Sequence, residues 1–204
     1  MILFLSSLLF SLSSNLDNVV VGTAYGLKKI KIGIIANLII AIITSAGTFL
    51  SMSVGIYISK FLPQYITNSF GAGIIILLGG YFVIESVTKF KYNKNSKELA
   101  LKDINDMIKY AEKSDLDSSG DIDMKEALLV ALELTFNNLG TGVAASITGV
   151  SIQLTVIFTF ILSILTIKLG ETIGNNVLGT FLGKYGPLIS GILLIILGII
   201  EFFN

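Results

Sequence analysis

Six long apolar segments alternate with polar sequence along the chain, and each is long enough to cross a membrane. Their bounds are Ile2–Leu27, Ile32–Ile56, Ile66–Val87, Ala127–Val150, Leu154–Ile173 and Pro187–Phe203. A membrane-spanning helix needs about 20 predominantly apolar residues, because the hydrocarbon core of a bilayer is about 30 Å thick. The pattern therefore predicts an all-α polytopic membrane protein, with six transmembrane helices lying in the lipid bilayer.

The longest hydrophilic stretch, Thr88–Lys125, separates the third segment from the fourth. Its apolar residues recur at the spacing of one face of a helix, at positions Leu101, Ile104, Ile108 and Ala111. This spacing predicts a short amphipathic helix that leads into the acidic sequence at the end of the stretch.

That acidic sequence, DLDSSGDIDMKE from Asp115 to Glu126, has the form of an EF-hand calcium loop. Such a loop has oxygen ligands at positions 1, 3, 5, 7, 9 and 12, and glycine at position 6. Gly120 is at the sixth position, and the ligand positions hold Asp115, Asp117, Ser119, Asp121 (through its backbone carbonyl), Asp123 and Glu126. The loop is predicted to bind Ca²⁺ or Mn²⁺ with weak to moderate affinity. The alternative is a solvated turn whose carboxylates complement the dipole of the next helix.

The two halves of the chain resemble each other. The first and fourth segments share a polar pair followed by glycine, in LDNVVVGTA from Leu16 and FNNLGTGVA from Phe136. The third and sixth segments share GIIILLGG from Gly73 and GILLIILG from Gly191. Halves of three helices enter the membrane from opposite sides, which predicts an inverted repeat like those of secondary transporters. The expected domains are residues 1–87, a linker over 88–126, and residues 127–204.

The two polar pairs are predicted to lie at the same depth. Asp17 precedes Lys28 by eleven residues, and Asn137 follows Lys125 by twelve. At ~1.5 Å per residue, both lie roughly 16–18 Å from the membrane edge, near the middle of the core. A charged carboxylate at that depth costs about 2.5–3.5 kcal/mol on insertion scales. Asp17 should therefore face the bundle interior, water, an amide or an ion.

Oxygen-bearing side chains surround both pairs, and the chain has neither cysteine nor histidine. Oxygen ligands suit hard divalent cations, whereas thiolate sites, disulfides and imidazole catalysis are excluded. We expect a cation or proton path rather than an enzyme, formed by Asn15, Asp17, Asn18, Glu133, Asn137 and Asn138. The alternative is that these groups join helices by hydrogen bonds, beside small residues that permit close packing.

Composition and lysine placement indicate how the chain lies in a membrane. Hydrophobic residues make up 53% of the sequence and charged residues only 14%, against about 25% charged in soluble domains. Thirteen of the fourteen lysines fall on one side of the predicted bundle, and Lys60 falls on the other. Because cytoplasmic loops carry the excess of lysine, the linker is predicted to be cytoplasmic, with both termini on the outer side of the cell membrane.

Four sequences identify the chain as similar to a known family. They are SLSSNLDNVVVGTAYGLKKIKI, GGYFVIES, DLDSSGDIDMKEA and LTFNNLGTGVAASITG. The chain resembles the YtaF-type sporulation membrane proteins of spore-forming Gram-positive bacteria, within the superfamily of MntP-type manganese efflux pumps. The resemblance covers essentially the whole chain and implies two inverted halves of three helices.

The resemblance also implies roles for single residues. Asp17 matches the first intramembrane Asp of the pumps, and Glu85 matches an acidic residue that closes the third helix. Asn137 occupies the position at which the pumps have a second Asp. The two motifs of this chain therefore contain one intramembrane carboxylate, where those of the pumps contain two. Glu85, Glu171 and Glu201 lie near segment ends, where exposed interfacial carboxylates are expected, and Lys168 is placed to neutralise Glu171.

Two functions remain open at the level of sequence. The first is a sporulation-associated transporter of divalent cations of the Mn²⁺ or Ca²⁺ type, with its conduction site where the halves meet. The second is a non-transporting sporulation component that senses or structurally uses a cation bound at the cytoplasmic loop. No nucleic-acid partner is expected, and the sequence specifies no oligomeric state.

The orientation can be tested directly, because the chain has no cysteine of its own. A cysteine in place of Lys97 should not react with a membrane-impermeant thiol reagent added to intact cells, since the linker is predicted to be cytoplasmic. A cysteine in place of Lys60 is the matched control and should react. Labelling of the first variant and protection of the second would reverse the orientation.

Overall fold

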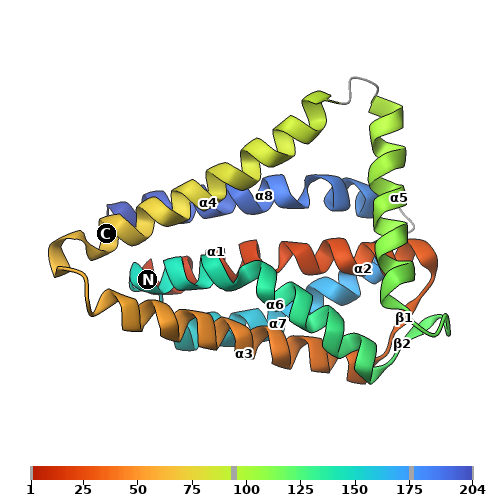
Figure 1. Ribbon diagram of the computed structural model, residues 1–204, viewed down its shortest axis with the longest axis horizontal. Coiled ribbons are helices and arrows are strands. Elements are labelled where there is room, and N and C mark those ends of the chain that lie inside the picture. Colours follow the sequence, from red (N-terminus) through yellow and green to blue (C-terminus); the bar gives the residue numbers. More distant parts are fainter. Residues whose placement is uncertain (1, 93–95, 175–176, 204) are drawn as a thin grey trace.

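The computed structural model describes residues 2–92, 96–174 and 177–203. These residues form helices joined by short connections, with one pair of two-residue strands (Figure 1). In chain order the elements are α1 (Ile2–Ser14), α2 (Leu16–Lys28), β1 (Lys31–Ile32), α3 (Ile34–Ser59), α4 (Gln64–Tyr92), α5 (Ser96–Ser114), β2 (Asp121–Ile122), α6 (Met124–Ile147), α7 (Ile152–Ile173) and α8 (Val177–Phe202).

Among the described residues, six helices are long and apolar enough to cross a membrane, as the hydropathy pattern predicts. The first span, Ile2–Lys28, is interrupted at Asn15, where α1 ends and α2 begins. Two helices extend well beyond the predicted spans. α4 continues to Tyr92, beyond the expected end at Val87, and α8 begins at Val177 although its apolar run was expected to start at Pro187. A proline inside a membrane helix is tolerated when neighbouring groups satisfy the freed backbone carbonyl.

The helices form two packed groups with the first span between them (Figure 1). α4 packs along α8, and α3 packs against both α6 and α7. α1 and α2 contact α7 on one side and α8 on the other, so the first span joins the two groups. Residues of this span are therefore placed to face both packed groups.

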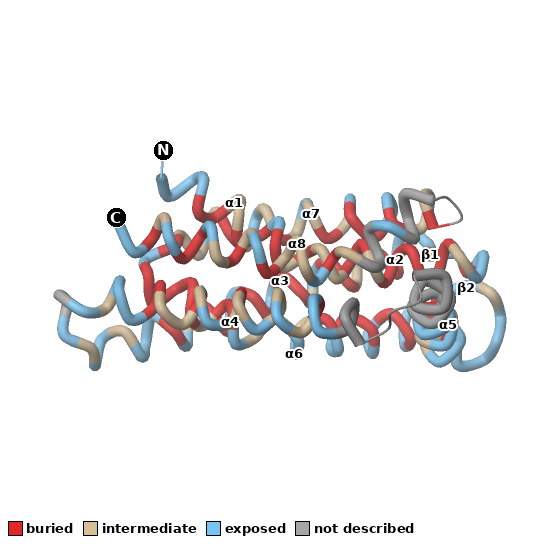
Figure 2. The backbone as a smooth tube through the Cα atoms, turned by 90° about the horizontal axis from the view of Figure 1, so that it is seen from above, coloured by how far each residue is buried: buried red, intermediate tan, exposed pale blue. Residues whose placement is uncertain are grey.

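Small and polar residues fill the interior of the bundle, and large apolar residues cover its outside. The buried residues of α1 are Ser6, Ser7, Phe10, Ser11 and Ser13, while Ile2, Leu3, Phe4 and Leu5 of the same helix are exposed. Figure 2 shows buried positions along the facing sides of the helices. Burial of hydroxyls with exposure of aliphatic chains is the pattern expected when the solvent is lipid.

Glycines allow α2 and α7 to approach until their backbones touch. A Cβ atom added to Gly22 would overlap the carbonyl oxygen of Ile167, and one added to Gly170 would overlap the carbonyl of Val19. Gly79 and Gly191 meet in the same way between α4 and α8. These contacts set the spacing of the first span against α7 and the spacing of α4 against α8.

The linker is attached to the end of the bundle by a strand pair and by α5. β1 and β2 are parallel, with Ile32 opposite Ile122. The predicted amphipathic helix is present as α5, and its residues Met107 and Ala111 are buried in one cluster with Tyr25 of α2. Figure 1 shows α5 crossing the ends of the spans. The side chains of Leu101 and Ile104 lie outside the described residues.

One expectation about the segment ends is wrong. Glu201, expected to be an exposed interfacial carboxylate, is 1% exposed and accepts a hydrogen bond from the hydroxyl of Ser6. Glu201 does lie near the end of its segment, but its side chain faces α1 instead of the surface.

The close contact between α2 and α7 gives a stability prediction. Gly22→Ala should lower the free energy of unfolding by about 1–3 kcal/mol, because the added methyl overlaps backbone atoms that cannot move independently. Gly80→Ala is the matched control, since a Cβ atom there meets nothing within 4 Å. Unfolding of both variants in detergent, followed by circular dichroism, measures the difference. Equal stability of the two would contradict the packing.

Candidate functional site

Asp17 lies in the first turn of α2, and two amides of α6 donate hydrogen bonds to it. Its Oδ2 atom accepts from Asn138 Nδ2 at 2.8 Å and from Asn137 Nδ2 at 3.3 Å. Its Oδ1 atom accepts from the backbone N–H of Asn18 at 2.9 Å. The structure thus brings the two polar pairs together, as their predicted equal depth requires. Their role in conduction stays a prediction.

Further amides and hydroxyls extend this site into the bundle. Asn18 Nδ2 donates to Asn15 Oδ1 at 2.8 Å and to Ser163 Oγ of α7 at 3.0 Å. Asn15 Nδ2 donates to the carbonyl of Ser11 at 2.7 Å, next to the interruption of the first span. Thr44 of α3 also lies within hydrogen-bonding distance of Ser163. The network therefore connects α1, α2, α3, α6 and α7 through polar atoms.

Two cavities adjoin the network. A small one of about 10 Å³ is lined mostly by hydroxyl and amide side chains, among them Asn15, Asn18, Thr48 and Asn138; this is roughly the space of one water molecule. A larger one of about 570 Å³ is lined by Asp17 together with residues of α5. Asp17 is half-buried and faces this larger cavity.

The larger cavity is bounded by residues from α1, α2, α4, α5, α6 and α8. Glu133 and Asn137 line it from α6, and Asp106 and Tyr110 line it from α5. Burial raises the pKa of the Tyr110 hydroxyl, and the nearby Tyr25 and Glu133 raise it further, so the hydroxyl stays protonated at neutral pH. Acidic and aromatic side chains therefore share the walls of the cavity.

Sequence reasoning identified Glu133 as a neighbour of Asn137 but missed Asp106 and Tyr110. Both residues lie on α5, and nothing in the sequence shows that this helix folds back against the first span. An ion pair between Lys28 and Glu112, at 2.5 Å, helps to hold it there. The helical spacing of Leu101, Ile104, Ile108 and Ala111 was the one available signal, since it marks α5 as amphipathic.

The acidic loop brings three of its six predicted ligands close together. One carboxylate oxygen from each of Asp115, Asp117 and Glu126 lies within 4.8 Å of the others. Asp115 is 7% exposed and Glu126 is 3% exposed. Because buried carboxylates are normally paired or bound to metal, this arrangement is chemically suited to a hard cation.

Backbone hydrogen bonds fix the shape of the loop. Asp115 accepts from the N–H groups of Ser119 and Gly120, both at 3.0 Å. Gly120 has φ +82°, a left-handed conformation that glycine adopts without strain. Hydrogen bonds from Ser119 hold the pKa of Asp117 below its usual range, so this carboxylate is charged at neutral pH and able to act as a ligand.

Glu126 joins the loop to the first turn of α6. Its Oε1 atom accepts from the N–H of Leu116 at 2.6 Å, and its Oε2 atom accepts from the N–H of Asp123 at 2.9 Å. Asp123 Oδ1 in turn accepts from the N–H of Glu126, which completes a capping box. The loop and the start of α6 therefore move as one unit.

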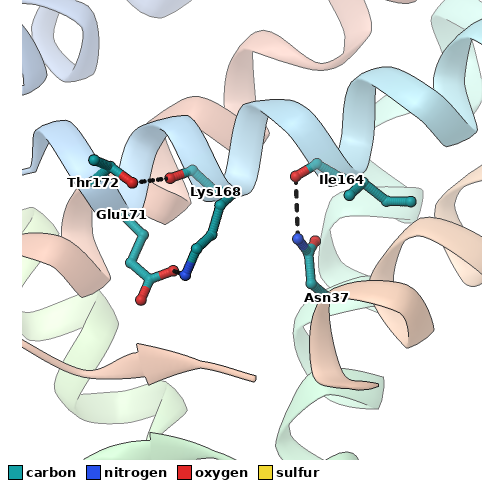
Figure 3. Close-up of polar contacts among 5 residues, drawn as sticks. All are labelled: Asn37, Ile164, Lys168, Glu171 and Thr172. Carbon is teal, nitrogen blue, oxygen red and sulfur yellow. Dashed lines mark hydrogen bonds and ion pairs between the residues drawn. The ribbon is translucent and has the colours of Figure 1, made fainter. Parts of the chain in front are cut away.

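The remaining predicted residues lie at the edges of these sites or away from them. The hydroxyl of Ser119 donates to the carbonyl of Asp121 at 2.9 Å, so two predicted ligands contact each other. Glu85, in α4, is not among the residues that line either cavity. Lys168 and Glu171 form the expected ion pair on α7, with their charged atoms 2.7 Å apart (Figure 3). The same figure shows Asn37 of α3, whose side-chain nitrogen donates to the carbonyl of Ile164 on α7.

Comparison with known proteins identifies a relative. The chain is similar to a curated protein described as "Probable sporulation protein YtaF" from Bacillus subtilis (strain 168). The sequences are 31% identical over 208 residues, which cover 95% of this chain and 97% of the relative. No protein-family model matches the chain, and no solved structure matches it.

The geometry of the loop predicts the effect of removing its ligands. Asp115→Ala and Glu126→Gln should each weaken Ca²⁺ binding by at least about tenfold, because each removes a charged ligand from one side of the cluster. Isothermal titration calorimetry on the intact protein measures this. Glu112→Gln, on α5 outside the cluster, is the control and should bind as the parent does. Unchanged affinity in both loop variants would exclude a cation site here.

Proposed function

The chain belongs to the family of the sporulation protein YtaF, and on this premise we propose that it is a sporulation-associated membrane protein that transports divalent cations. The transported ions are of the Mn²⁺ or Ca²⁺ type. The observation that carries the proposal is the contact of Asp17 with Asn137 and Asn138 across the bundle. The resemblance to the manganese efflux pumps is compatible with this activity.

The chemistry of the site supports cation binding. Each asparagine presents one donor nitrogen and one acceptor oxygen, so rotation of the amide by 180° exchanges a hydrogen-bond donor for a metal ligand. In the structure, Asn137 and Asn138 point their nitrogens at Asp17. A cation beside Asp17 would reverse the Asn137 amide and gain its neutral oxygen as a ligand beside the carboxylate. The Asn138 nitrogen also donates to the carbonyls of Ser14 and Leu134, so this amide would keep its orientation. This set of hard oxygen ligands suits Mn²⁺, Ca²⁺ and Mg²⁺.

The arrangement of helices supports an inverted repeat. If the first three spans are exchanged with the last three in order, α2 takes the place of α6 and α7 takes the place of α3. The packing of α2 against α7 then corresponds to the packing of α6 against α3. The same exchange leaves the α4–α8 and α3–α7 pairs in place. A pseudo-twofold relation of this kind puts Asp17 and Asn137 in corresponding positions, and transporters commonly bind their substrate at such an interface.

The loop favours a second function. Asp115, Asp117 and Glu126 lie close enough together to hold a cation at the start of the fourth span, so an ion could bind there without being moved across the membrane. In that case it would be a non-transporting sporulation component that senses or structurally uses the bound cation. Transport is preferred because structural use of the loop gives no reason for a carboxylate and two amides to meet inside the bundle.

The transport function predicts the effect of removing one charge. Asp17→Asn should abolish Mn²⁺ uptake into proteoliposomes, because the substitution removes the one carboxylate among the grouped amides while preserving size and shape. The variant should unfold at the same temperature as the parent or a higher one, since a charge inside the membrane is unfavourable. Metal-sensitive fluorescence inside the vesicles gives the rate, compared across Mn²⁺, Ca²⁺ and Mg²⁺.

Glu171→Gln provides the control for this experiment. Glu171 pairs with Lys168 on α7 and does not line either cavity, so the substitution should leave uptake unchanged. Parental rates of uptake in Asp17→Asn would reject the proposed site. Absence of uptake in the parent protein, with intact binding at the loop, would favour the non-transporting function.

A further inference from the structure

The cavity beside Asp17 is larger than a metal ion requires. Its volume of about 570 Å³ falls within the range of roughly 300–1,000 Å³ that is usual for small-molecule pockets. A divalent cation, by contrast, draws its oxygen ligands to within about 2.0–2.6 Å. A bare ion held at Asp17 would leave nearly all of this space unused.

The walls of the cavity are largely apolar. α2 contributes a continuous aliphatic surface, and α5 adds a thioether; these residues are Leu16, Val20, Val21, Ala24 and Met107. Two aromatic rings complete the lining, Phe82 from α4 and Tyr110 from α5. Such walls favour a hydrocarbon or an aryl group over a hydrated ion.

Among the described residues, the charged side chains that line the cavity are all acidic. Asp17, Asp106 and Glu133 line it from three different helices, and the described lining residues include no lysine. Negative side chains around an apolar space attract cations and oppose anions. Aromatic rings add to the attraction, because the face of a ring carries negative electrostatic potential.

We propose that this cavity binds a monovalent organic cation with an apolar body, namely a protonated primary amine on an alkyl or aryl group. The ammonium group has three donors and no acceptor, and it meets the carboxylates of Asp17, Asp106 and Glu133, which line the same cavity. The apolar body lies against α2 between Phe82 and Tyr110. The inference goes beyond the transport of metal ions and does not depend on it.

Equilibrium binding to the full-length protein tests the inference. Radiolabelled phenethylammonium is titrated onto the protein in nanodiscs of zwitterionic lipid, and empty nanodiscs provide the background. Binding should saturate at one site per chain. 2-Phenylethanol has the same shape without the charge, and it should compete at least about tenfold more weakly than unlabelled phenethylammonium. Equal competition by the two compounds would overturn the inference, because a merely hydrophobic cavity would not distinguish them.

Substitutions in the walls separate charge from packing. Asp106→Asn should weaken the binding of phenethylammonium by about tenfold, and Phe82→Ala should weaken it by removing the surface for the ring. Glu171→Gln is the matched control, because it removes a carboxylate that does not line the cavity, and it should bind as the parent does. Unfolding temperatures establish that each variant is folded. Parental affinity in folded Asp106→Asn and Phe82→Ala would contradict the site.

The outcome is independent of the metal measurements. A parent protein that binds phenethylammonium and moves no Mn²⁺ would support the organic-cation site and reject metal transport. A parent that moves Mn²⁺ and does not bind phenethylammonium would reject the organic-cation site and leave metal transport in place. The two proposals can therefore fail separately.

Discussion

The carboxylate of Asp17 imposes the constraint on which the centre of the molecule depends. A charge near the middle of a membrane is costly unless polar groups surround it, and here they come from a helix far away in sequence. Asn138 donates to Asp17 at 2.8 Å and also to the carbonyl of Ser14 at 3.1 Å. To supply these hydrogen bonds, α6 must lie beside the interruption of the first span. On the side of the span that faces α7, glycines allow the two helices to pack closely. The glycine contacts between helices and the polar network thus both contribute to the surroundings of the Asp17 carboxylate.

The same helix, α6, connects the intramembrane site to the acidic loop. Glu126 is in its first turn, and Asn138 follows twelve residues later, which is roughly 18 Å along the helix axis. Asp115 directly follows Ser114, the last residue of α5, so the loop holds the ends of both helices. A cation bound at Asp115 and Glu126 would fix the angle between α5 and α6. These two helices carry Asp106, Tyr110 and Glu133 in the cavity wall, so occupancy of the loop would set the width of the cavity.

The sequence was sufficient for features that depend on local hydropathy or on distance from a charged flank. The six spans and α5 follow from apolar spacing, and the meeting of Asp17 with Asn138 follows from their equal depth. Features set by packing between distant segments were not predictable in this way. The burial of Glu201 depends on the direction in which α8 turns its last residues, and the position of Asp106 depends on how α5 folds back. Hydropathy placed the start of the sixth span at Pro187, because Lys184 and the glycines around it interrupt an apolar run that α8 continues from Val177.

Asp17 lines the larger of the two cavities and not the smaller one, and the two differ sharply in volume. Towards α5 the cavity is about 570 Å³, whereas the polar space around Asn15, Thr48 and Asn138 is about 10 Å³. An ion at Asp17 would therefore have an open cavity beside it, and the hydroxyl-lined space at Asn138 has room for about one water molecule. If the halves are inverted repeats, exchange of their conformations would close the large cavity and open the corresponding space on the opposite side. The spans that line the large cavity are formed by α1 with α2, α4, α6 and α8. The exchange maps this set of spans onto itself, so the same helices would line the space on the opposite side.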